Sequence, residues 1–195
     1  HPHTKFPSHT DRKLTPGVDL TTGSLGQGAS TATGAALGNK IDGHDSHVFC
    51  VIGDGALTGG MAYEALNNAA RLEKNFIIVL NDNNMSISEN VGGISAYLSN
   101  IRTADSYTGL KNGLENTLRQ IPVYGDRLIK GIRSTKQGIK QFLVPGMFFE
   151  EMGITYLGPV DGHNIAQVTR VLNDAKKVNG AVLVHVITKK GKGYG

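Results

Sequence analysis

Four short apolar runs alternate along the chain with segments of helical pattern. The runs cover residues 47–52, 76–80, 154–157 and 181–188, and each has a Gly or an Asn at one of its ends. Continuous apolar runs of this length are typical of strands that are buried on both faces of a parallel sheet. We therefore expect four strands at these positions.

The segments between the runs carry helical patterns. Residues 29–37 are rich in the small side chains of a helix that packs closely against a sheet, and Asn164 is suited to cap the start of another helix. Residues 85–109 show no regular pattern. Helices are expected over residues 29–37, 60–72, 110–143, 145–152 and 164–177. This alternation predicts an α/β fold with an open, mostly parallel sheet and helices on both faces.

The composition agrees with one globular domain. The chain has 195 residues and an apolar fraction of 39%, which is enough for a sizeable core. Its apolar runs are shorter than the ~18 residues that a membrane-spanning helix needs. The single cysteine, Cys50, excludes an intramolecular disulfide and favours a reducing compartment, here the cytoplasm. Because the chain begins without a Met and ends on Lys-Gly-Tyr-Gly, we expect residues 1–195 to be a single domain that is a fragment, a subunit or the ordered part of a longer protein.

The excess of basic over acidic residues does not indicate a nucleic-acid-binding protein. The net charge is +4 and the isoelectric point is about 9.2. However, the chain has no Trp and no basic run interleaved with aromatic residues. Much of the positive charge lies at helical spacing within residues 110–145, which is typical of a solvated helix face. A phosphorylated small molecule stays open as a ligand.

Polar motifs follow the first two predicted strands directly. Asp54 lies between two glycines after the first strand, and Asn83 ends an Asn-Asp-Asn triplet after the second. Ligands of open parallel sheets bind at the carboxyl ends of the strands, and carboxylate and amide oxygens suit a hard cation such as Mg²⁺. Gly53 and Gly55 let backbone amides approach a diphosphate. The structural alternative is that both motifs are tight turns.

Several segments of the chain resemble one enzyme family. A Gly-Asp-Gly motif followed by an Asn-rich triplet resembles the metal and diphosphate signature of thiamine diphosphate enzymes. Within that group, the chain from about residue 46 to its end is similar to the 1-deoxy-D-xylulose-5-phosphate synthase family. The segments that carry the resemblance are residues 54–65, 80–87, 148–153, 156–163 and 185–194.

The front of the chain is more similar to transketolases. Residues 16–28 resemble the N-terminal half of split transketolases, and the synthases have Gly-His-Ser where this chain has Gly23, Ser24 and Leu25. His9 matches the spacing of a transketolase histidine that contacts the donor substrate. By this resemblance, His9 is the candidate catalytic residue.

The resemblance also implies the roles of the site residues. Asp54 and Asn83 would bind Mg²⁺ through their side chains, and Met85 through its backbone carbonyl. Lys190 would approach the diphosphate, and the alternative is a solvated lysine at a strand end. The remaining cofactor-binding residues implied are Gly53, Gly55 and Ala56 along the diphosphate and Gly23, Ser24 and Leu25 along the rings.

The activity implied by the resemblance requires a second domain. In this family, thiamine diphosphate and Mg²⁺ support transfer of a two-carbon unit from pyruvate, with decarboxylation, to glyceraldehyde 3-phosphate. This reaction serves isoprenoid and thiamine biosynthesis. The activating glutamate comes from a pyrimidine-binding domain, which we expect in the same chain or in a partner chain of a homodimer or heterotetramer. The alternatives are a split transketolase subunit and a non-catalytic protein with the cofactor fold.

The sequence favours or allows a structural interpretation for four other residues. Cys50 and His185 lie on apolar runs and are expected in the core, with the histidine hydrogen-bonded. His163 is expected to be a structural loop residue. Glu64 would face a subunit interface by resemblance, and the alternative is a surface position on a helix. No contact with nucleic acid or a membrane is expected.

Overall fold

The described residues contain one fully parallel four-stranded sheet. The strands are β1 (Val48–Gly53), β2 (Phe76–Asp82), β3 (Thr155–Asp161) and β4 (Ala181–Ile187). Their order is β1-β2-β4-β3, and each neighbouring pair is parallel. The computed structural model describes Pro7, His9 and residues 11–72, 76–85, 92–103 and 146–194. The sheet confirms the open, parallel α/β architecture expected from the apolar runs.

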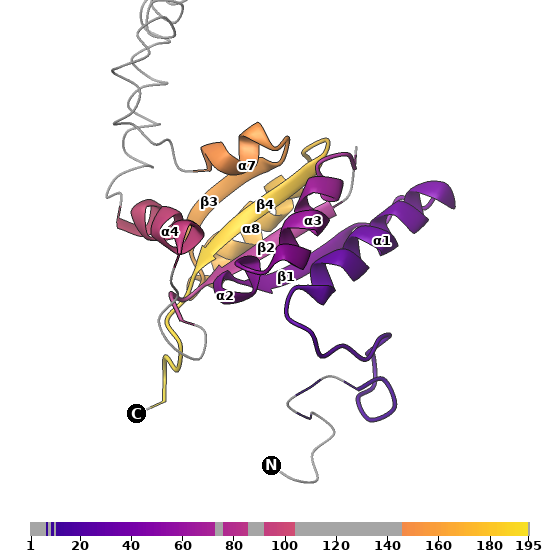
Figure 1. The fold of residues 1–195 in the computed structure, drawn as a ribbon, viewed down its shortest axis with the longest axis horizontal. Coiled ribbons are helices and arrows are strands. Elements are labelled where there is room, and N and C mark those ends of the chain that lie inside the picture. Colours follow the sequence, from indigo (N-terminus) through magenta and orange to yellow (C-terminus); the bar gives the residue numbers. More distant parts are fainter. Residues whose placement is uncertain are drawn as a thin grey trace, which may run out of the picture.

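Helices cover both faces of the sheet. Figure 1 shows α1 and α3 on the near face and α8 behind the strands. The helices are α1 (Gln27–Ile41), α2 (Asp54–Leu57), α3 (Gly60–Ala69), α4 (Gly93–Thr103), α7 (Met147–Glu151) and α8 (Ile165–Ala175). The predicted helix over residues 110–143 lies outside the described residues.

Successive side chains of the central strands point alternately into two separate hydrophobic cores. Phe76, Ile78 and Leu80 of β2 pack with α1 and α3, while Ile77 joins the core under α8. All four are at most 1% exposed. Full burial of one such side chain contributes roughly 1.5–3 kcal/mol. Burial on both faces explains why the central strands β2 and β4 appear in the sequence as continuous apolar runs.

Two predictions of local structure were wrong. Residues 85–109 contain the helix α4, although no regular pattern was expected there. Its apolar side chains Ile94, Leu98 and Ile101 recur at helical spacing, and the last two are buried. In addition, β2 continues through Asp82, so the second polar motif begins inside the strand.

The predicted cap of the last helix is confirmed. Asn164 has an extended backbone and precedes α8, and its side-chain oxygen accepts a hydrogen bond of 3.1 Å from the backbone N–H of Gln167. This bond satisfies one of the free N–H groups at the start of the helix. The sequence therefore determines where α8 begins on the second face of the sheet.

Gly158 allows β3 to approach β4 closely. The pairing of these strands shifts register between Leu157 and Val160. Gly158 lies in this shift with a φ of 131°, and a Cβ atom there would lie 2.7 Å from the backbone oxygen of His185. A larger residue would meet both a strained backbone conformation and a fixed neighbour.

We predict that Gly158→Ala lowers the free energy of unfolding by about 2–4 kcal/mol because of this strain and overlap. Urea denaturation would measure the change. Gly38→Ala in α1 is the matched control, since its added methyl meets open space. It should raise stability by up to ~1 kcal/mol. Wild-type stability in Gly158→Ala would contradict the packing argument.

Candidate functional site

The two polar motifs meet at the carboxyl ends of β1 and β2. Gly53 pairs with Asn81 across the strands. The next residue, Asp54, is only 3% exposed and begins α2. Its carboxylate accepts hydrogen bonds from the backbone N–H groups of Gly55 and Asn83. The predicted proximity of Asp54 and Asn83 is therefore present in the folded chain.

A second buried carboxyl group lies beside Asp54. Burial, the nearby charge of Asp82 and a hydrogen bond with that residue raise the pKa of Asp54 above its ordinary value. Two adjacent buried carboxylates repel each other unless a proton or a cation compensates them. The environment of Asp54 thus fits a bound cation.

The loop after β2 has a backbone shaped by its own side chains. The Asp82 carboxylate accepts a hydrogen bond of 3.1 Å from the N–H of Asn84, and the Asn83 side-chain oxygen accepts one of 3.0 Å from the N–H of Met85. Asn84 has a left-handed φ of 60°, a conformation that Asn tolerates well. The Asn83 oxygen keeps a second lone pair for another ligand.

This donor set fits Mg²⁺ better than a transition metal. Asp54, Asn83 and the Met85 carbonyl offer oxygen atoms only. Within the described ranges, no group of three or more His, Cys, Asp or Glu residues is arranged to hold a metal. Mg²⁺ typically takes one or two carboxylates and fills its other positions with water and substrate phosphates. A site with few protein ligands is therefore compatible with a cation that accompanies a diphosphate.

The sequence did not reveal the importance of Asp82. Its side chain is fully buried, and it accepts hydrogen bonds from His185 Nε2 at 2.9 Å and from the Arg102 guanidinium. Burial disfavours its charged form, but the bond from His185 and the charge of Arg102 outweigh this effect and lower the pKa of Asp82. One sequence signal could have identified Asp82, because it is a carboxylate at the end of an apolar strand. A buried carboxylate requires hydrogen-bond or charge partners.

The core interpretations of His185 and Cys50 are confirmed. His185 is fully buried, and its Nδ1 lies 2.7 Å from the hydroxyl of Tyr156. The carboxylate of Asp82 can only accept, so His185 donates to it from Nε2, while its Nδ1 contacts the Tyr156 hydroxyl. Cys50 is 4% exposed. Burial raises the pKa of its thiol to about 11, so the thiol is unreactive at neutral pH.

The front loop lies against the helices that follow β1. Gly26 is buried with a φ of 82°, and a Cβ atom there would lie 3.3 Å from the N of Ala62 and 3.8 Å from the O of Ala56. Gly23, Ser24 and Leu25 come directly before this contact and are exposed. The loop therefore borders the Asp54 region through Gly26. These residues remain predicted rather than demonstrated cofactor contacts.

The loop after β4 is tied to the same edge of the sheet. The Thr188 hydroxyl donates to the Asn81 side-chain oxygen at 2.8 Å. The N–H of Lys189 donates to His163 Nε2 at 2.9 Å, which agrees with the structural interpretation of His163. Lys190 follows and is exposed. Its contact with a diphosphate stays a prediction.

His9 is also exposed. Its predicted contact with substrate is not tested by the fold, and the role remains a prediction.

Among the helices of the described ranges, none combines the length and the apolar character that crossing a membrane requires.

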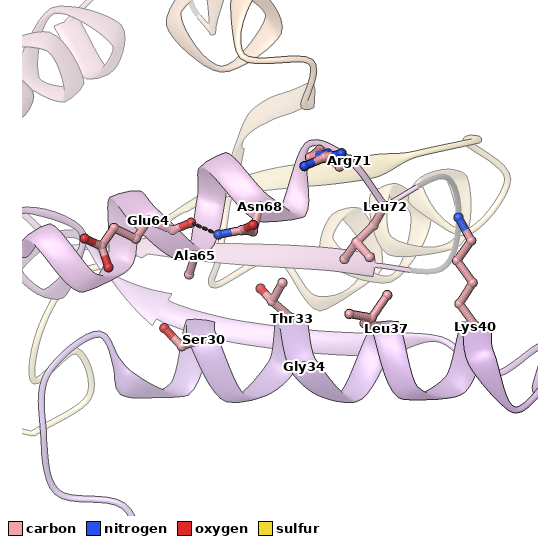
Figure 2. Close-up of a pocket in the computed structure, with 10 residues that line it drawn as sticks. All are labelled: Ser30, Thr33, Gly34, Leu37, Lys40, Glu64, Ala65, Asn68, Arg71 and Leu72. Atoms are coloured by element: carbon pink, nitrogen blue, oxygen red, sulfur yellow. Dashed lines mark hydrogen bonds between the residues drawn. The ribbon is translucent and has the colours of Figure 1, made fainter.

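A groove of about 480 Å³ runs between α1 and α3. Figure 2 shows Glu64 near one end, and Lys40 and Arg71 near the other. Asn68 donates to the backbone oxygen of Glu64 at 2.9 Å within α3. The groove is lined by Ser30, Thr33, Gly34, Leu37, Lys40, Glu64, Ala65, Asn68, Arg71 and Leu72.

Solved structures with a similar fold include two transketolases. The transketolase from Campylobacter jejuni has a TM-score of 0.64 and 25% sequence identity, covering 99% of this chain and 24% of that protein. The transketolase from Leishmania mexicana has a TM-score of 0.58 at 21% identity, covering 96% of this chain and 23% of that protein. The second similarity concerns the fold alone.

The sequence relatives are more specific. The profile of the family described as 1-deoxy-D-xylulose-5-phosphate synthase matches residues 17–188. The synthase of Lachnoclostridium phytofermentans is 54% identical over 173 residues, which are 89% of this chain and 28% of that protein. The synthase of Caldanaerobacter subterraneus subsp. tengcongensis is 55% identical over 165 residues, covering 85% of this chain and 26% of that protein. The chain thus spans about a quarter of the length of these relatives. The match over residues 17–188 and these identities show that the chain belongs to the 1-deoxy-D-xylulose-5-phosphate synthase family.

Proposed function

We propose that the chain is the diphosphate- and Mg²⁺-binding part of an enzyme that makes 1-deoxy-D-xylulose 5-phosphate. The enzyme would transfer a two-carbon unit from pyruvate, with loss of CO₂, to glyceraldehyde 3-phosphate. The observation that carries the proposal is the contact between Asp54 and the backbone of Asn83 at two parallel strand ends. The membership of the chain in the synthase family supports the choice of reaction.

The residues of this edge have complementary tasks in the proposal. Asp54, Asn83 and the Met85 carbonyl hold Mg²⁺, which neutralises the diphosphate. When bound, thiamine diphosphate supplies the electron sink for decarboxylation and for carbon–carbon bond formation. The residues proposed to surround it are Gly53, Gly55, Ala56 and Lys190 at the diphosphate and Gly23, Ser24 and Leu25 at the rings. His9 is proposed to contact the substrate.

A second domain is proposed to complete the site. The chain covers 28% of the Lachnoclostridium phytofermentans relative, so most of that protein has no counterpart here. We propose that a pyrimidine-binding domain, in the same polypeptide or in a partner chain, contributes the glutamate that activates the cofactor. The chain alone should therefore bind thiamine diphosphate weakly. A cytoplasmic location also stays a proposal.

The groove between α1 and α3 is proposed as a subunit contact. Within the described part of the chain, α1 buries only Ala29 and Ala36, whereas Leu37 is 48% and Ile41 76% exposed. Exposed apolar side chains on one helix often mark a protein interface. A homodimer or a heterotetramer would cover this surface, including Glu64.

Transfer of ketol units between sugar phosphates is the second candidate function. The structural similarity to the Campylobacter jejuni transketolase supports it, because that similarity extends over 99% of this chain. The front loop with Gly23, Ser24 and Leu25 also supports this candidate, because its sequence resembles that of transketolases. The two candidates differ in the donor, which is pyruvate or a ketose phosphate.

We predict that Asp54→Asn weakens Mg²⁺-dependent binding of thiamine diphosphate by about a hundredfold or more, equivalent to ~3 kcal/mol. The amide keeps the size of the side chain but removes its charge. Calorimetry at high cofactor concentration would measure the loss. Because the substitution also removes one of two adjacent buried carboxyls, the metal-free chain should unfold at the same temperature or higher. The control is Asp174→Asn, whose side chain is 55% exposed on α8. Unchanged cofactor affinity in Asp54→Asn would refute the metal assignment.

We predict that the chain alone shows little turnover of pyruvate and glyceraldehyde 3-phosphate, because the activating group is expected in another domain. Adding a pyrimidine-binding half from a synthase should raise product formation by orders of magnitude. Product would be measured as 1-deoxy-D-xylulose 5-phosphate. Robust turnover by the chain alone would rule out the two-part site, and preference for a ketose phosphate donor would favour the transketolase reaction.

A further inference from the structure

Arg102 of α4 bridges the two neighbours of a proposed metal ligand. One guanidinium nitrogen donates to Asp82 Oδ1, and the other donates to Asn84 Oδ1 at 2.6 Å. Asn83 lies between these two residues in the sequence. The planar fork of Arg thus joins both sides of the loop that carries the proposed Asn83 and Met85 ligands.

The Asp82 end of this bridge is firmly held. Its other carboxylate oxygen accepts from His185 Nε2 at 2.9 Å, and His185 in turn contacts the Tyr156 hydroxyl at 2.7 Å. The backbone oxygen of Asp82 also accepts from the N–H of Thr188 at 2.8 Å. Strands β3 and β4 therefore support Asp82 from the sheet, and α4 contacts it through Arg102.

The Asn84 end of the bridge lies in the turn of the loop. Its φ of 60° is an uncommon conformation for a residue with a side chain. The same residue donates its N–H to Asp82, while Met85 donates its N–H to Asn83. The bond from Arg102 to the Asn84 side chain adds a contact from outside the loop. Asn84 lies between Asn83 and Met85 in the sequence. The contact therefore restrains the turn that sets the positions of the Asn83 side-chain oxygen and the Met85 backbone carbonyl.

We propose that Arg102 is a positioning residue that holds the Asp82–Met85 loop in the shape that binds the divalent cation. The inference rests on the proposed function, since it assumes that Asn83 and Met85 bind this cation. Arg102 does not touch the metal in this proposal. It acts through Asp82 and Asn84, and its side chain is 14% exposed.

Simple electrostatics makes the opposite prediction. A positive charge close to a cation site repels the cation, so removing the Arg102 charge should strengthen metal binding if charge alone mattered. If Arg102 positions the loop, its removal should weaken binding instead. The sign of the change therefore separates the two accounts.

The test uses Mn²⁺ as a spectroscopic probe in the presence of saturating thiamine diphosphate, with free Mn²⁺ followed by electron paramagnetic resonance. We expect Arg102→Gln to weaken Mn²⁺ binding about 10–100-fold, the usual effect of losing a group that orients a metal ligand. Arg102→Lys keeps the charge but cannot bridge two acceptors in the same way, and it should also weaken binding about tenfold or more. Tighter or unchanged binding in either folded variant would overturn the proposal.

Two further variants keep the test decisive. Asn84→Gly removes the acceptor but favours the left-handed backbone, so it should weaken binding less than Arg102→Gln. A larger loss than in Arg102→Gln would contradict the bridge. Arg170→Lys on α8 is the matched control, because this residue is exposed on another helix, and it should bind Mn²⁺ like the wild type. Circular dichroism without metal would establish that each variant is folded.

The outcome also distinguishes this inference from the proposed function. If the wild-type chain takes up no Mn²⁺ with thiamine diphosphate even after a pyrimidine-binding half from a synthase is added, the metal site and this inference both fall. If the wild type binds and either folded Arg102 variant binds as tightly or more tightly, only the positioning role falls.

Discussion

The buried charge of Asp82 is the interaction on which the edge of the sheet depends. A carboxylate without exposed surface is costly unless it is paired and hydrogen-bonded. Asp82 meets both conditions through His185 of β4 and Arg102 of α4. The end of β2 is thereby joined to the adjacent strand and to a helix. Loss of either partner would leave a buried charge only partly compensated, so the three residues constrain one another.

Asp82 and Asp54 are neighbours with opposite electrostatic situations. The protein compensates Asp82, whose pKa is lowered by His185 and Arg102 against the effect of burial. For Asp54, burial and the nearby Asp82 raise the pKa and outweigh the hydrogen bonds from the backbone of Gly55 and Asn83, which lower it. Neighbouring titratable groups whose pKa values are shifted in opposite directions often mark functional sites. In the proposed function, Mg²⁺ would stabilise the charged form of Asp54, which burial and Asp82 disfavour.

Much of the fold could be predicted from local patterns. The strands β2 and β4 appear as continuous apolar runs because both of their faces are buried. The same expectation was wrong for β1, an edge strand whose Phe49 and Val51 are 46% and 72% exposed. The proximity of Asp54 and Asn83 followed from parallel topology, since adjacent parallel strands end at the same edge. The helix α4 was missed, although Leu98 and Ile101 now show its buried face.

The hydrogen-bond partners in the site could not be predicted in the same way. His185 was expected to be a bonded core histidine, but nothing in its local sequence identifies Tyr156 or Asp82 as its partners. The bridge formed by Arg102 depends on where the fold places the end of α4 relative to the end of β2. Such contacts are set by tertiary structure and leave no periodic signal along the chain.

The sheet order has a consequence for when the site can form. Strand β2 lies in the interior of the sheet, between β1 and β4, but β4 is the last of these strands in the chain. Asp82 and His185 are 103 residues apart in sequence. Contacts between such distant residues form slowly because a long loop must close first. During synthesis, β1, α3 and β2 emerge well before His185 does. The edge that carries the polar motifs therefore reaches its native charge balance only after β4 has joined the sheet.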